Sequence, residues 1–268
     1  MMPSRMKWLL PMLSLFVFAA GCPKGPEVAV TDPLEDTLAG IEEAWAFRGE
    51  VGNGIVEQLL DDALRRFPNE PKVHWRRSRL YVSEGMAAAT PTEAARHYSK
   101  ARAAALVCLD EDGRFQQKRR ESGWAVALTM LEPEREVCVG WAAWSWVRWM
   151  AAHGRTASSL DLERIDALVA QTEGKRLEGG PTTLWLTGLL AAVRSDDKHD
   201  YDKAVVDLGK AVDITKQPLV IHSDIVFEIA LPTADGALLG GQLKASSSLT
   251  ADTPEDRRAI ERMAVLRN

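Results

Sequence analysis

Two short stretches bring together residue types that enzymes and metal sites use. His222-Ser223-Asp224 contains the residue types of a hydrolytic triad, but adjacent residues do not point toward one another, so no nucleophilic catalysis is predicted. Asp110-Glu111-Asp112-Gly113 is acidic enough to suggest calcium. However, Arg114 stands where the next oxygen ligand would be, and the glycine is misplaced for an EF-hand. We expect this second stretch to be a solvated turn.

Longer catalytic motifs are missing from the sequence. It contains no glycine-rich phosphate loop, no HExxH and no GxSxG, the usual signatures of nucleotide enzymes, zinc proteases and hydrolases. The 5 histidines are too scattered to predict a metal cluster. We therefore expect a protein that is not an enzyme, with no catalytic residues, no metal and no cofactor.

Cys22 is the residue whose surroundings predict a chemical modification. A basic start and an apolar run over residues 8–18 precede Ala19-Ala20-Gly21-Cys22, an order typical of a signal peptide too short to span a membrane stably. Its end resembles the bacterial lipobox, in which the cysteine thiol is diacylated. We expect lipidation at Cys22 and removal of residues 1–21. Because Ala19 is usually Leu in that motif, ordinary cleavage near Ala20 is the alternative.

The residues after the cleavage site indicate where the chain resides. Pro23 replaces the Asp that retains enteric lipoproteins at the inner membrane, which favours the periplasmic face of the outer membrane. After cleavage the chain keeps 31 basic and 38 acidic residues, a formal charge of −7. Nucleic acid is not expected as a partner, because no basic patch would neutralise its phosphates.

Cys108 and Cys138 remain in the mature chain. In an oxidising envelope they could form a disulfide, whereas free cysteine is also a common small core residue. Neither the number nor the spacing of the cysteines decides between these alternatives, and we favour the unpaired one.

Apolar residues recur at helical spacing almost throughout the chain after residue 33, and no run alternates convincingly with a period of two. The fold is therefore predicted to be all-α. Three helix starts share one pattern, in which a capping residue precedes proline and an acid follows at the third helical position. These starts are Asp32-Pro33-Leu34-Glu35, Thr90-Pro91-Thr92-Glu93 and Thr253-Pro254-Glu255-Asp256.

The succession of helix pairs predicts a repeat architecture. Ala63 stands five residues before Pro68, as at the end of a tetratricopeptide (TPR) repeat, and Tyr81 and Gly85 follow at the next repeat's aromatic and turn positions. Residues 200–212 fit the second helix of a repeat nearly residue for residue. We predict an α-solenoid of degenerate TPR-like helix pairs over residues 34–268, after a signal peptide (1–21) and a lipidated tether (22–33).

The stretch 137–154 contains one charge, Arg148, and four tryptophans, Trp141, Trp144, Trp146 and Trp149. These rings spread over about 200° of a helix, which predicts burial on both sides. A membrane span is excluded, because the uncharged run is shorter than the roughly 20 residues required and Arg148 lies within it. Some of these rings, and Trp185, could instead line a groove, where indole offers a flat face and one N–H donor.

The order of these features resembles the T-component of TRAP-type solute transport systems, the TatT family of TPR lipoproteins. The resemblance implies a lipid-anchored helical protein that can associate into a trimer and that docks a periplasmic solute-binding protein. The matching features are the lipobox, residues 63–68, the helix over 98–109, the Trp-rich helix over 140–150, residues 162–172 leading into 179–188, and the repeat at 201–214.

The chain also departs from this family. Residues 195–199 are short and polar where the family often carries a Gly/Pro-rich insertion, and residues 218–268 match only loosely. These differences affect the expected oligomer contacts and any pore. The alternative function is that of a TPR scaffold lipoprotein for envelope or pilus assembly.

Overall fold

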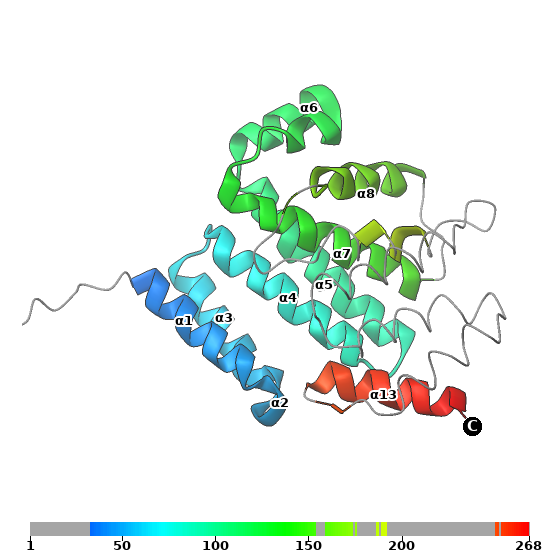
Figure 1. Ribbon diagram of the computed structural model, residues 1–268. Coiled ribbons are helices and arrows are strands. Elements are labelled where there is room, and N and C mark those ends of the chain that lie inside the picture. Colours follow the sequence, from blue (N-terminus) through cyan, green and yellow to red (C-terminus); the bar gives the residue numbers. More distant parts are fainter. Residues whose placement is uncertain are drawn as a thin grey trace, which may run out of the picture. The chain divides into compact units, whose positions relative to one another are not determined.

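The computed structural model describes residues 33–153, 159–173, 175, 186–187, 189–191, 250–251 and 253–267. Every regular element within these residues is a helix, which confirms the all-α prediction (Figure 1). The α-solenoid arrangement remains a prediction. None of the described helices is both long enough and apolar enough to cross a membrane. Cys22 and the predicted signal peptide lie outside the described residues.

The helices follow one another along the chain with short connections. Their bounds are α1 Pro33–Ala46, α2 Arg48–Val51, α3 Asn53–Arg66, α4 Pro71–Ala87, α5 Pro91–Asp110, α6 Gly113–Leu128, the 3-10 helix η1 Pro133–Arg135, α7 Glu136–Ala152, α8 Ser159–Gln171 and α13 Pro254–Arg267.

The predicted helix starts are confirmed. Helices α1, α5 and α13 each begin at the expected proline. Before α5, the Thr90 hydroxyl accepts a hydrogen bond of 3.2 Å from the Glu93 backbone N–H. Before α13, Thr253 and Asp256 cap each other's backbone N–H groups, at 3.2 and 3.1 Å. These bonds satisfy N–H groups that a helix N-terminus otherwise leaves without a partner.

Helices α1, α3, α4, α5 and α7 pack in that order, each against the next (Figure 1). The connection of three residues between α4 and α5 makes these two long helices an antiparallel pair. Helix α8 packs against α6 and α7, and α13 packs against α4. Helix α4 is therefore in contact with both the N-terminal helices and the later ones.

Two hydrophobic clusters lie on either side of α4. The N-terminal core is small and consists of aliphatic residues of α1, α3 and α4, namely Leu38, Ile41, Val56, Leu60, Ala63, Val73 and Leu80. The second, which we call the tryptophan core, is built from the other buried apolar residues of α4 and those of α5 to α8, together with Leu186, Leu189, Leu190 and Ala191. Ala63, placed by the sequence at the end of a TPR-like repeat, is fully buried in the N-terminal core.

Candidate functional site

The Trp-rich helix α7 lies inside the tryptophan core. Trp141, Trp144 and Trp146 are only 9%, 5% and 3% exposed, whereas Trp149 is partly buried. All residues from Cys138 to Arg148 are buried. This finding confirms the prediction of a helix covered on both sides. Trp185 lies outside the described residues.

One edge-to-face contact joins α6 to α7, and another lies within α6. The Trp124 ring centroid lies 6.2 Å from that of Trp146 at an interplanar angle of 73°, and 5.7 Å from that of Phe115 at 75°. Aromatic rings prefer this geometry because the positive edge of one faces the negative face of the other. Gly123, with φ of 82°, breaks α6 directly before Trp124. This left-handed backbone conformation suits glycine, and it precedes the residue that reaches the core.

A guanidinium group packs on the rings of α7. The central carbon of Arg102, on α5, lies 4.7 Å from the Trp149 centroid and 5.1 Å from that of Trp146. Burial lowers the pKa of Arg102, and the negative charge of Asp161 partly opposes this effect. The Nε1 atom of Trp146 is buried and finds no acceptor among the described residues, so this ring contributes through its faces and edges.

Arg148, the only charge in the Trp-rich stretch, is itself a core residue. It is 2% exposed, and its Nε and Nη2 atoms donate hydrogen bonds of 3.2 and 3.0 Å to the Tyr98 hydroxyl. Tyr98 in turn packs against Gly85, where an added Cβ would lie 2.4 Å from the Tyr98 Cε1 atom. Helices α4, α5 and α7 are thus linked through Gly85, Tyr98 and Arg148. The sequence placed Gly85 at a TPR turn position but did not predict this link.

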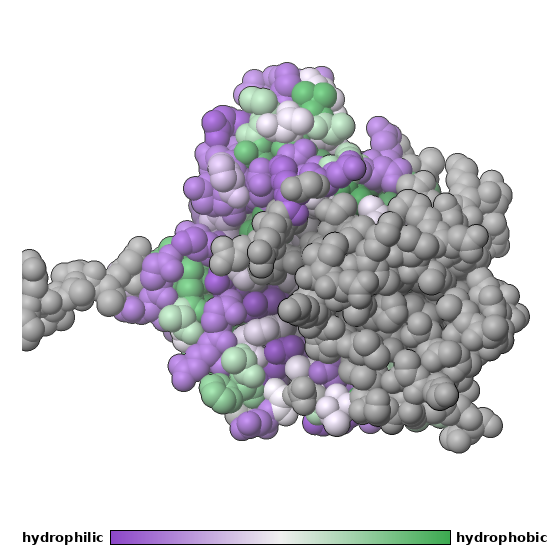
Figure 2. All heavy atoms as spheres, in the orientation of Figure 1, coloured by the Kyte–Doolittle hydropathy of each residue, from purple (hydrophilic) through white to green (hydrophobic). Residues whose placement is uncertain are grey.

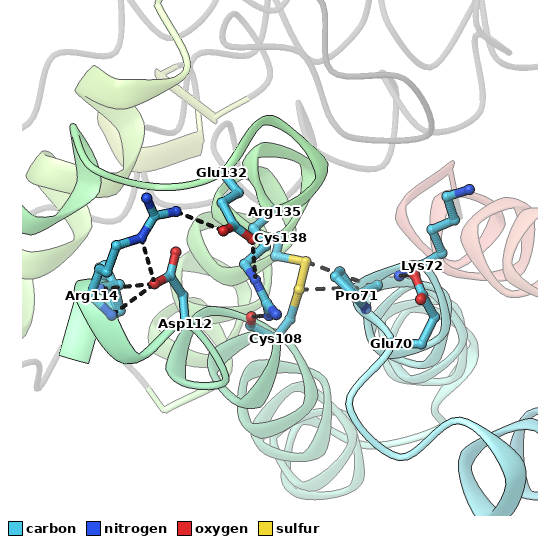
Figure 3. A network of polar contacts seen from close by, with 10 residues as sticks. Glu70, Pro71, Lys72, Cys108, Asp112, Arg114, Glu132, Arg135 and Cys138 are labelled. Carbon is cyan, nitrogen blue, oxygen red and sulfur yellow. Dashed lines mark hydrogen bonds and ion pairs between the residues drawn. A yellow bond between two sulfur atoms is a disulfide. The ribbon is translucent and has the colours of Figure 1, made fainter.

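A disulfide joins α5 to α7 (Figure 3). Cys108 and Cys138 are fully buried and their sulfur atoms are bonded, so the unpaired alternative favoured from the sequence is wrong. The Pro71 carbonyl oxygen, at the start of α4, lies 3.9 and 4.0 Å from the two sulfur atoms. Arg135 Nη1 donates a hydrogen bond to the Cys108 carbonyl oxygen. The disulfide is therefore enclosed where three helices meet.

The acidic stretch at residues 110–113 forms the turn between α5 and α6, with Glu111 and Gly113 exposed as the sequence predicted, whereas Asp112 is buried. Asp112 is 5% exposed, and its Oδ1 atom accepts hydrogen bonds from the backbone N–H groups of Arg114, at 2.9 Å, and Phe115, at 3.1 Å. Asp112 is therefore the N-cap of α6. The Arg114 side chain reaches Glu132 at 2.6 Å, which ties the start of α6 to the segment before α7 (Figure 3).

A second group of aromatic and guanidinium side chains lies between α1 and α4. The Trp45 ring has the Arg48 guanidinium 3.9 Å from its centroid and the Arg79 guanidinium 4.0 Å from it. Arg79 also lies 5.1 Å from the centroid of Trp75, and Arg76 lies 4.1 Å from it. Guanidinium groups stack well on indole because they are planar and weakly hydrated.

Two acids balance this group. Both carboxylate oxygens of Glu42 accept from Arg79 Nη2 at 3.0 Å, and Oε1 also accepts from Arg76 Nε at 2.6 Å. Burial lowers the pKa of Arg79 to about 10, while the charge of Glu42 acts in the opposite direction. From α13, Glu255 pairs with Arg48 at 2.5 Å and accepts from the Ser83 hydroxyl at 2.9 Å. The C-terminal helix is thereby joined to α2 and α4.

Other candidates from the sequence are not brought together. Among the residues that the structure describes, no three His, Cys, Asp or Glu side chains form a group that could hold a metal ion. His222-Ser223-Asp224 and the repeat at 200–212 lie outside those residues. The described residues offer tight packing, stacked cations and charged helix surfaces.

No family model and no curated protein matches the chain.

Proposed function

We propose that this chain is a lipid-anchored docking protein on the periplasmic face of the outer membrane, which receives a soluble solute-binding protein of a TRAP-type uptake system. The observation that carries the proposal is the disulfide between Cys108 and Cys138. Disulfides persist in oxidising compartments such as the periplasm and are rare in the cytosol. This argument is independent of the N-terminal stretch that ends at Cys22, which predicts the same compartment.

The order of helix packing supports a docking role. Helices α1, α3, α4, α5 and α7 each pack on the next, as successive helices of TPR-like repeats do. Arrays of this kind bind other proteins through the helix surfaces that they leave uncovered. The resemblance to the TatT family supplies the identity of the partner and the expectation of a homo-oligomer.

The anchoring part of the proposal is tested by membrane fractionation. Wild-type protein from its native cells should sediment with membranes, because two or more acyl chains hold a protein stably. Cys22→Ser should move it to the soluble fraction. Met130→Ser, at an exposed residue, leaves both the lipidation motif and the disulfide intact; it is the control and should stay with the membranes. Tight membrane binding of Cys22→Ser would contradict lipidation at this residue.

The docking part is tested by cross-linking in intact native cells, followed by mass spectrometry. Lys100 and Lys118 are sites for an amine-reactive reagent on α5 and α6. The proposal expects a soluble solute-binding protein among the joined products. Recovery of pilus or outer-membrane assembly components, without any solute-binding protein, would contradict it and favour the scaffold alternative.

A further inference from the structure

Three large apolar side chains are exposed on α3 and directly before α2. Phe47, directly before α2, is 53% exposed, and Ile55 and Leu59 on α3 are 45% and 36% exposed. Ile55 and Leu59 are one helical turn apart and so share a face of α3. Helix α2, which Phe47 directly precedes, contacts α3. Figure 2 shows hydrophobic residues beside strongly hydrophilic ones around α1 and α2. We call these three residues the α2–α3 face.

Carboxylates without an ion pair flank Phe47. Glu43 and Glu50 are exposed, and each is hydrogen-bonded through its backbone to Phe47, at 3.2 and 3.0 Å, so both lie within one turn of it. Neither carboxylate is within ion-pair distance of a described basic side chain. Neighbouring acids differ, since Glu35 pairs with Lys72 at 2.6 Å.

The charge of this region selects among possible occupants of the α2–α3 face. Residues 33–66 contain eight acidic and three basic residues; bases of α4 pair with Glu35, Glu42 and Asp61, whereas Glu43 and Glu50 form no ion pair with a described base. The same face of a second copy would be repelled, and so would an anionic lipid surface. A segment with apolar side chains flanked by Lys or Arg would bury the three exposed residues and neutralise Glu43 and Glu50.

We propose that the α2–α3 face, with Glu43 and Glu50, docks a basic amphipathic segment of a partner protein. This inference deepens the proposed docking function and rests on it, because it names the chemistry of the partner surface. Docking would remove exposed apolar area from water, and the carboxylates would give the encounter its orientation and its salt dependence.

The test places a photo-cross-linking amino acid at Leu59 in the full-length protein in native cells and sequences the joined segment. We expect a segment with net positive charge and apolar residues. Glu43→Gln with Glu50→Gln should lower the yield roughly threefold or more. Glu111→Gln with Glu134→Gln is the matched control, since these exposed acids lie elsewhere, and should leave the yield unchanged. Thermal melts confirm that each variant is folded.

Several results would overturn the inference. The first is that no protein is joined at Leu59. The second is that the joined molecule is a lipid, a second copy of this chain or an acidic segment. The third is an unchanged cross-linking yield in the Glu43/Glu50 variant. A cross-linker at Met130, a 48% exposed residue after α6, gives a positional control. A solute-binding protein joined from Met130 but not from Leu59 would leave the proposed function intact and reject the α2–α3 face. A basic segment of an assembly component joined from Leu59 would support docking at the α2–α3 face and reject the solute-binding protein as the partner.

Discussion

The N-terminal core and the tryptophan core share helix α4 but are held together differently. The tryptophan core buries three indoles of α7 almost completely and carries the disulfide between α5 and α7. The N-terminal core contains seven mainly aliphatic residues, and ion pairs to α4 surround it. These pairs include Arg76–Glu42 at 2.6 Å and Arg77–Asp61 at 3.0 Å.

This difference separates the part that gives rigidity from the part that offers a surface. Buried aromatic area and a covalent link stabilise a core over a wide range of conditions. Ion pairs that are partly exposed contribute little and are screened by salt. We therefore expect α1 to α3 to open more readily than α5 and α7, and to be the region that adapts to a partner.

The largest expected effect is that of Trp144→Ala. Trp144 is 5% exposed, so its removal leaves a cavity that should cost about 3–5 kcal/mol of the free energy of unfolding. Phe47→Ala, at a residue 53% exposed, is the aromatic control and should cost less than about 1 kcal/mol. Denaturation followed by far-UV circular dichroism measures both. Equal losses would show that α7 is not the main core helix.

The double variant Cys108→Ala/Cys138→Ala should have the next largest effect on the free energy of unfolding. A link across a sequence separation of 30 residues stabilises by about 3.5 kcal/mol through the lower entropy of the unfolded chain. The measurement is chemical denaturation with hydrogen exchange by mass spectrometry. Faster exchange should appear in α5 and α7 and be smaller in α1 and α3. Uniform loosening would mean that the two cores do not behave as separate regions.

Glycine substitutions provide a matched pair across the two regions. Gly85→Ala should destabilise by about 1–3 kcal/mol, because its Cβ would meet the Tyr98 ring at 2.4 Å. Gly40→Ala, in α1, has no atom within 4 Å of the new Cβ and should stabilise by about 0.5–1 kcal/mol. Thermal melts of both variants suffice. A stabilising Gly85→Ala would contradict the close approach of α4 to α5.

The smallest expected effect concerns the ion pairs of the N-terminal region. Glu42→Gln should cost about 1 kcal/mol, since Arg76 and Arg79 lose a shared carboxylate that is partly exposed. Hydrogen exchange at low and high salt is the measurement. High salt should speed the opening of α1 in wild-type protein and have less effect in Glu42→Gln. If α5 and α7 respond to salt as strongly as α1, the proposed division fails.

Local features were predictable from the sequence, while contacts between distant segments were not. The prolines and caps at Thr90 and Thr253 mark helix starts because capping involves residues only three positions apart. The burial of α7 followed from a helix that is apolar nearly all round. The disulfide did not follow, because pairing depends on the 6.2 Å between two Cα atoms in different helices.

Polar residues in the interior were the hardest to place. Arg148 and Asp112 belong to types that usually lie at the surface, yet their partners allow burial. Tyr98 becomes a neighbour of Arg148 only after α5 and α7 have packed. The cap at Asp112 is local, because its two N–H donors lie two and three positions later, but this stretch was interpreted only as a calcium loop or a solvated turn. The break of α6 at Gly123 was also unexpected, since an isolated glycine is often tolerated within a helix.

The most direct test of the account is the intact mass of the mature protein, isolated from native membranes without reducing agent. Location in an oxidising envelope predicts a chain that begins at Cys22, carries acyl groups there and lacks two hydrogen atoms because Cys108 and Cys138 are bonded. A chain that keeps residues 1–21, or that has an unmodified Cys22 and two free thiols, would contradict both the anchor and the compartment on which the proposed docking function depends.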